Sequence, residues 1–258
     1  MDIQYSPKYR ELFAEHIPRF MVLEIEPIMK RLGHAPARPL CVFDVGANVG
    51  GWTMALLSHS GPWIGEVHMF EPLPANRARL DEARRDGLFR GNARLAVQPC
   101  ALSHAAGTAR IHFEAEESRL ASIDNSAAMM PMRDIPLGRS LEIETRTLDD
   151  YCAGQKIERI DILKIDVEGH EMSVLRGAER MFREKRIGIV AYELGPHQIE
   201  RREFFRDFFR FFEGHGYQNH RYRENGWSTM PIKAYRPGFE TFDQVVMRMA
   251  VHPDYADA

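Results

Sequence analysis

Two acidic side chains stand where they could bind opposite ends of a small-molecule cofactor. Asp44 precedes the glycine-containing segment 45–51, VGANVGG, and Glu71 ends the next apolar run. A carboxylate before the turn would repel a pyrophosphate and attract an amino group, whereas one after the second strand can accept two hydrogen bonds from a ribose diol. The pair therefore favours a nucleoside that carries an amino-acid tail, S-adenosylmethionine.

The glycine turn departs from the motifs that bind nucleotides through their phosphates. The dinucleotide pattern G-x-G-x-x-G is absent because Asn48 stands where its middle glycine would fall, and G-x-x-x-x-G-K-[ST] is absent as well. Gly46 and Gly50 still permit a tight turn and a close approach of the backbone to a ligand. An ordinary turn with a helix-capping acid is the alternative, and the spacing to Glu71 favours a cofactor site.

Further titratable side chains follow the apolar run that begins at Ile160. Alternate residues of a strand share a face, so Lys164 and Asp166 point the same way, and Glu168 follows them. A lysine in an apolar strand needs a partner, and Asp166 is the nearest candidate. We expect Lys164 and Glu168 to contact a substrate, with mutual neutralisation of Lys164 and Asp166 as the alternative.

Two routes could remove a proton from an acceptor hydroxyl at this edge. A base is the favoured route, and the candidates are His170, whose unperturbed pKa is near ~6.5, Asp166 and Glu193. A divalent metal held by Asp166, Glu168 and Glu193 is the less favoured route. Tyr192, beside Glu193, is a further substrate-binding candidate.

The elements that must position these residues alternate between apolar runs and helical periodicity. Strands are predicted at 40–45, 66–72, 94–102, 141–148, 160–167 and 187–194, with helices between most of them, and 108–113 is expected to extend or pair with the third strand. The pattern predicts an α/β fold, a mostly parallel sheet with helices on both faces. The strands of the tail, at 217–222 and 243–249, have no helix between them and are expected to form a closing antiparallel pair.

The chain divides into an N-terminal helical extension, residues 1–39, and a cofactor-binding domain, residues 40–258. Two segments, 114–140 and 223–241, fit no framework element, and long loops of this kind in a compact domain are typical of lids. The apolar helices of the extension could cover the sheet or join two chains as a homodimer.

The amino-acid composition indicates the cellular compartment of the chain and the kinds of partner it could bind. The chain has 258 residues, a net charge of −3 and 44% hydrophobic residues, which is typical of a soluble globular protein and argues against a nucleic-acid partner. Its three cysteines are far apart, so neither a disulfide framework nor a structural zinc site is expected. No run is apolar enough for a signal peptide or a membrane span. We therefore expect a cytoplasmic protein.

Three segments together resemble the FkbM family of S-adenosylmethionine-dependent methyltransferases. They are 43–53 (FDVGANVGGWT), 70–76 (FEPLPAN) and 160–178 (IDILKIDVEGHEMSVLRGA), and the resemblance runs from about Leu40 to Tyr222. It implies a class I methyltransferase fold, Rossmann-like, with a seven-stranded sheet whose last strand is antiparallel. It also implies methyl transfer to a hydroxyl of a small molecule or glycan, such as a sugar, polyketide or related natural product.

Matching the motifs residue by residue implies where the cofactor lies. The residues implied around its methionine part are Asp44, Gly46, Asn48 and Gly50. Glu71 falls on the ribose, and segment 99–102, which includes Cys100 and Ala101, lies near the adenine. The rival hypotheses are another cofactor-dependent enzyme on the same sheet, an oxidoreductase or a cyclase, and a non-catalytic binding module.

Overall fold

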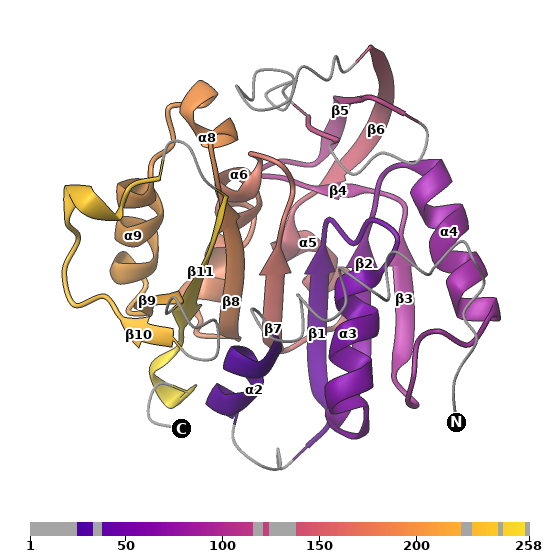
Figure 1. Ribbon diagram of the computed structural model, residues 1–258, viewed down its shortest axis with the longest axis horizontal. Coiled ribbons are helices and arrows are strands. Elements are labelled where there is room, and N and C mark those ends of the chain that lie inside the picture. Colours follow the sequence, from indigo (N-terminus) through magenta and orange to yellow (C-terminus); the bar gives the residue numbers. More distant parts are fainter. Residues whose placement is uncertain are drawn as a thin grey trace.

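A computed structural model describes residues 25–32, 38–115, 121–123, 138–222, 229–241 and 245–255. Its centre is an eight-stranded sheet in the order β10-β9-β11-β8-β7-β1-β2-β3 (Figure 1). The strands are β1 (Leu40–Val45), β2 (Ile64–Phe70), β3 (Arg94–Gln98), β7 (Ile160–Ile165), β8 (Ile187–Leu194), β9 (Gln218–Tyr222), β10 (Thr229–Pro231) and β11 (Val246–Val251). The predicted mostly parallel α/β sheet is confirmed.

Helices cover both faces of this sheet, which is why its central strands are mostly apolar. Every residue of β1 and β7 is buried. One face packs against α5 (Leu148–Gln155), α6 (Glu171–Arg176), α7 (Glu179–Arg183) and α9 (Phe205–Gly214), and the other against α2 (Glu26–Leu32), α3 (Gly51–Ser60) and α4 (Pro74–Arg85). Neighbouring residues of β1 point to opposite faces of the sheet. Phe43 lies in the core on the first face, and Val42 lies in the core on the second.

The tail closes one edge of the sheet with antiparallel strands. β11 lies between β8 and β9 and runs antiparallel to both, so the predicted antiparallel pair is confirmed. β10 then pairs antiparallel with β9 and adds an eighth strand. Segment 223–241, predicted to be a lid, therefore contributes β10 and a short 3-10 helix, Pro237–Phe239, in its described part.

A second, three-stranded sheet was not expected. It has the order β4-β6-β5, formed by β4 (Ala101–Leu102), β5 (Gly107–Phe113) and β6 (Arg139–Arg146), and is drawn at the top of Figure 1. The expectation that 108–113 pairs with the third strand is wrong, because β3 ends at Gln98 and β5 instead pairs with β6 along its whole length. Most of the predicted lid 114–140, namely 116–120 and 124–137, lies outside the described residues.

In the N-terminal extension the structure describes the helix α2 and residues 38–39, and the division of the chain at residue 39 stays a prediction. α2 places Ile28 and Met29 in the second core, against the sheet, while residues 1–24 and 33–37 lie outside the described residues. Across the described ranges, no helix combines the length and apolar character that a bilayer crossing needs. Cys41, Cys100 and Cys152 are buried free thiols.

Candidate functional site

The carboxyl ends of β1, β2 and β7 meet the small sheet at a cavity. Its polar lining consists of Asn48, Glu71, Asn76, Asp166, Glu168 and His170, and its apolar lining includes Phe70, Ala101, Leu102, Ile111, Ala121 and Ile123. The strand order reverses between β1 and β7, and this switch point is where open α/β sheets bind ligands. The structure therefore gathers most of the predicted site residues at one place.

The glycine turn lies in close contact with both neighbouring strands. Gly46 has φ +77°, and a Cβ at this position would lie 1.8 Å from the carbonyl oxygen of Asp166. The N–H groups of Gly46 and Ala47 both donate to the carbonyl of Phe70, each at 3.0 Å. Only glycine satisfies this backbone and this spacing, so the turn depends on it.

Glu71 combines burial with hydrogen bonds from the turn. Its Oε2 accepts from the N–H of Asn48 at 2.9 Å and its Oε1 from the N–H of Leu73 at 2.8 Å. The residue is 5% exposed. Burial raises the pKa of this carboxyl to about 7, against the lowering effect of its hydrogen bonds. A carboxylate has about four acceptor positions, so Glu71 can still accept from a ligand hydroxyl.

Asp44 and Lys164 form a buried ion pair behind the glycine turn. They are register partners on β1 and β7, and Lys164 Nζ lies 3.1 Å from Asp44 Oδ1. Lys164 also donates to the carbonyl of Gly46 at 3.0 Å, and Thr53 donates to Asp44 Oδ2 at 2.7 Å. Neither side chain lines the cavity. Both side chains brace the glycine turn from behind, and Lys164 Nζ also lies 3.4 Å from Asp166 Oδ2, the pairing expected as the alternative. Contacts of Asp44 with the cofactor and of Lys164 with the substrate stay predictions.

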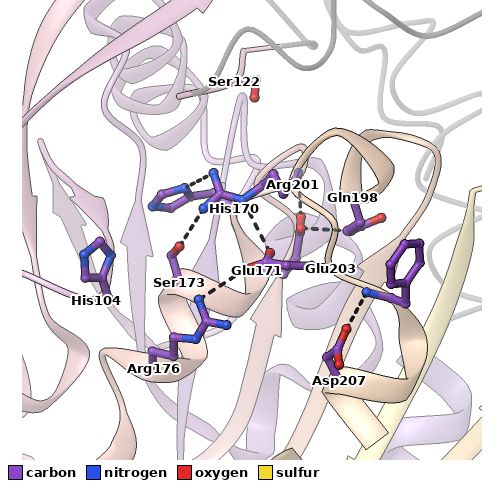
Figure 2. Close-up of polar contacts among 12 residues, drawn as sticks. His104, Ser122, His170, Glu171, Ser173, Arg176, Gln198, Arg201, Glu203 and Asp207 are labelled. Carbon is purple, nitrogen blue, oxygen red and sulfur yellow. Dashed lines mark hydrogen bonds and ion pairs between the residues drawn. The ribbon is translucent and has the colours of Figure 1, made fainter.

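His170 lines the cavity with both ring nitrogens engaged. Arg201 Nη1 lies 3.2 Å from Nδ1 (Figure 2). Ser103 Oγ lies 2.9 Å from Nε2. A guanidinium can only donate, so Nδ1 accepts and Nε2 carries the proton toward Ser103. Burial lowers the pKa of the ring, which keeps it neutral. This arrangement engages the lone pair of Nδ1 with Arg201, and the role of His170 as the base stays a prediction.

Glu171 organises the loop after β7, a role that sequence reasoning missed. Its Oε1 accepts from the N–H groups of Val167 and Gly169, at 3.0 and 3.2 Å, and its Oε2 accepts from Gln198 Nε2 at 3.0 Å. Gln198 also donates to the carbonyl of Glu193. The sequence indicated only an acid in the first turn of a helix, because this link between two loops has no local pattern.

Three further residues were predicted to contact the cofactor: Ala101, Cys100 and Gly50. Ala101 lines the cavity, whereas Cys100 is buried behind it. Gly50 caps α3 with φ +86° and does not line the cavity; a Cβ there would lie 2.7 Å from side-chain atoms of Leu80 and Phe89. Both residues pack beside the cavity, and their contacts with the cofactor stay predictions.

The two predicted residues at the end of β8 also differ from each other. Tyr192 is fully buried and stacks on Phe208 with centroids 5.3 Å apart, so the expected substrate contact is wrong. Its side chain points into the core beneath α9. Glu193, its neighbour on the opposite face, places a carboxylate near Glu168 and His197.

The strand order β9-β11-β8-β7-β1-β2-β3, its antiparallel strand β11 and the cavity at the switch point define a class I methyltransferase fold. A solved structure with this fold, methyltransferase FkbM from Methylobacillus flagellatus KT, matches with a TM-score of 0.53 and 17% identity over 90% of this chain. The match covers 48% of that protein, so the chain spans about half its length.

Sequence comparison places the chain within that class. The methyltransferase FkbM domain matches residues 44–219. 31-O-demethyl-FK506 methyltransferase FkbM from Streptomyces tacrolimicus is 32% identical over 66% of this chain and 67% of its own length. Methyltransferase 1 from Beauveria bassiana is 25% identical over 54% of this chain and 58% of its own length. The chain belongs to the methyltransferase FkbM family.

Proposed function

We propose that this chain transfers a methyl group from S-adenosylmethionine to a hydroxyl of a small molecule or glycan. The observation that carries the proposal is that Glu71 and Asp166, from the strands on either side of β1, line one cavity beside the glycine turn. The relative named for 31-O-demethyl-FK506 supports oxygen as the acceptor atom and a natural product as the acceptor class. The free cysteines support a reducing compartment such as the cytoplasm.

The residues present fit the proposed cofactor. Glu71 can accept hydrogen bonds from a ribose, and the apolar side chains of Leu102, Ile111 and Ile123 offer a surface for a flat base. The glycine turn brings backbone close to the cavity with no side chain at Gly46. When bound, S-adenosylmethionine supplies a methyl group already activated on a sulfonium.

The chain's own contribution is orientation and removal of a proton. Asp166 lines the cavity with its side chain 33% exposed, and its nearest charged partner is Lys164 Nζ at 3.4 Å. The other predicted bases are His170, whose nitrogens are both engaged, and Glu193, which does not line the cavity. We therefore assign Asp166 as the group that accepts the hydroxyl proton.

Glu71→Gln is expected to weaken the binding of S-adenosylhomocysteine by about 1–3 kcal/mol, the scale of a hydrogen bond to a charged group. A pH dependence follows as well. Because the pKa of Glu71 is about 7 without ligand, and a ribose binds the ionised form, affinity is full above pH 7 and falls below it. Between about pH 8 and pH 6 the dissociation constant should rise roughly tenfold.

Calorimetric titration of the wild-type chain and the Glu71→Gln variant over this pH range measures both effects. The variant should be weaker and should lose the pH dependence. Equal affinity at pH 6 and pH 8 in the wild-type chain would contradict a ribose on Glu71.

Asp166→Asn is expected to lower the methylation rate by about 10²–10⁴-fold, the usual contribution of a general base. The affinity for S-adenosylhomocysteine should change little. Asp81→Asn, on the exposed face of α4, is the matched control and should leave the rate unchanged.

The assay uses isotope-labelled S-adenosylmethionine, a panel of hydroxylated acceptors, and mass spectrometry to locate the methyl group. Methyl transfer to oxygen supports the proposal. Transfer only to nitrogen or carbon, or cofactor binding without turnover on any acceptor of the panel, contradicts the assignment of a hydroxyl acceptor.

A further inference from the structure

Three potential metal ligands converge beside the cavity, from one loop, one strand and one helix. They are Glu168 in the loop after β7, Glu193 in β8, and His197, the first residue of α8 (His197–Glu200). Their ligand atoms all lie within 4.8 Å of one another. Glu168 also lines the cavity, so the cluster adjoins the place where an acceptor would bind.

His197 is the observation that separates this cluster from an ordinary pair of acids. The residue is 1% exposed, and neither ring nitrogen has a hydrogen-bond partner among the described residues. Nδ1 faces the acids, 4.0 Å from Glu168 Oε2. A buried polar group without a partner is unfavourable, so a ligand that occupied the lone pair of Nδ1 would offset this cost.

The surrounding structure holds the imidazole in this position. A Cβ on Gly195 would lie 3.0 Å from Cε1 and 3.3 Å from Nδ1 of His197, so the backbone of Gly195 packs directly on the ring. Gln198 accepts from the N–H of Gly195. It also donates to Glu171, which fixes the loop after β7 (Figure 2). The same contacts thus position His197 and Glu168 relative to each other.

We propose that Glu168, Glu193 and His197 bind a divalent transition-metal ion such as Mn²⁺. Carboxylate oxygens suit hard divalent cations, and the imidazole favours a transition metal over Mg²⁺ or Ca²⁺. Side-chain rotations would bring the three donors to the spacing of about 3 Å that bond lengths near 2.1 Å require. Two carboxylates and a neutral imidazole leave open coordination positions for an oxygen ligand.

The role of the ion rests on the proposed function. An acceptor hydroxyl bound to the ion has a lowered pKa, and its proton passes to the carboxylate of Asp166. The sequence suggested Asp166, Glu168 and Glu193 as ligands. The structure replaces Asp166 with His197, because the Lys164 ammonium 3.4 Å from Asp166 opposes a nearby cation.

The test is a titration of the full-length, chelator-treated chain with Mn²⁺, without any cofactor or acceptor. Electron paramagnetic resonance measures the concentration of the free ion during the titration. One ion per chain is expected. Glu193→Gln and His197→Gln should each raise the dissociation constant at least tenfold, roughly the loss of one ligand's support. Gly195→Ala, which displaces the ring, should act in the same direction.

The matched control is His215→Gln, a histidine paired with Glu179 on the far end of α9, which should leave Mn²⁺ binding unchanged. Because His197 is buried, circular dichroism checks that each variant is folded. Glu193 is half-buried, so Glu193→Gln tests the metal site without disturbing the core. Absence of stoichiometric Mn²⁺ binding, or binding that all three substitutions leave intact, would overturn the proposal.

Binding of S-adenosylhomocysteine, measured on the same samples, separates the two proposals. A chain that binds S-adenosylhomocysteine and no Mn²⁺ lacks the metal site but keeps the proposed cofactor. A chain that binds Mn²⁺ and no S-adenosylhomocysteine keeps the metal site and loses the proposed function.

Discussion

Gly46→Ala is expected to destabilise the chain by roughly 2–6 kcal/mol, through backbone strain and overpacking together. The residue has φ +77°, and its new methyl group would lie 1.8 Å from the carbonyl oxygen of Asp166. That oxygen belongs to backbone, so it cannot rotate away as a flexible side chain would. The strands β1 and β7 must separate, or the turn must refold.

Urea denaturation followed by circular dichroism measures this loss, and calorimetry measures the accompanying loss of S-adenosylhomocysteine binding. Gly154→Ala is the matched control. Gly154 lies in α5 with nothing within 4 Å of an added Cβ, so alanine should be neutral or stabilise by up to about 1 kcal/mol. A Gly46→Ala variant as stable as the Gly154→Ala variant would contradict the close approach of turn and strand.

Lys164→Met is expected to lower the free energy of unfolding by about 3–5 kcal/mol, because it leaves the carboxylate of Asp44 buried without its cation. Lys164 and Asp44 are both buried, and their charged atoms are 3.1 Å apart. The variant also loses the hydrogen bond from Lys164 to the carbonyl of Gly46. Cofactor affinity should therefore fall together with stability.

A double-mutant cycle tests this explanation. Asp44→Asn combined with Lys164→Met removes the uncompensated charge and should recover part of the stability that Lys164→Met loses. Lys233→Met, at an exposed lysine, is the control and should change stability by less than about 0.5 kcal/mol. Additive losses in the double variant would show that the two charges do not stabilise each other.

The arrangement of the sheet follows from features that a single sequence displays. Apolar runs such as 160–165 alternate with helical segments, and this alternation indicates a parallel sheet buried on both faces. Because the carboxyl ends of parallel strands share one edge, residues that follow different strands were expected together. Glu71, Asp166 and Glu168 do line one cavity.

The roles within the site depend on pairings that no local pattern specifies. Lys164 lies 3.4 Å from Asp166, the partner expected from the sequence, but the register of β1 against β7 adds a second and closer partner, Asp44, at 3.1 Å. The sequence did not indicate the contact of His170 with Arg201, which is 31 positions away. His197 gave no signal, because only the folded loops bring it next to Glu168.

The three-stranded sheet was not predicted either, because its pairing also joins residues that are far apart in the sequence. β5 pairs with β6, which follows it only after the segment 114–138. Ile111 of β5 and Ile143 of β6 form a separate small core with Leu73. Short strands with this separation carry the same local preferences as strands that extend the main sheet. Their pairing gives the cavity an apolar wall on the side of Ile111.

A crystal structure of the chain with S-adenosylhomocysteine tests the central claim most directly. We expect the ligand in the cavity at the carboxyl ends of β1, β2 and β7, with its ribose hydroxyls within hydrogen-bond distance of the Glu71 carboxylate and its sulfur toward Asp166. A ligand bound elsewhere, or a Glu71 side chain turned away from the ribose, would contradict the account.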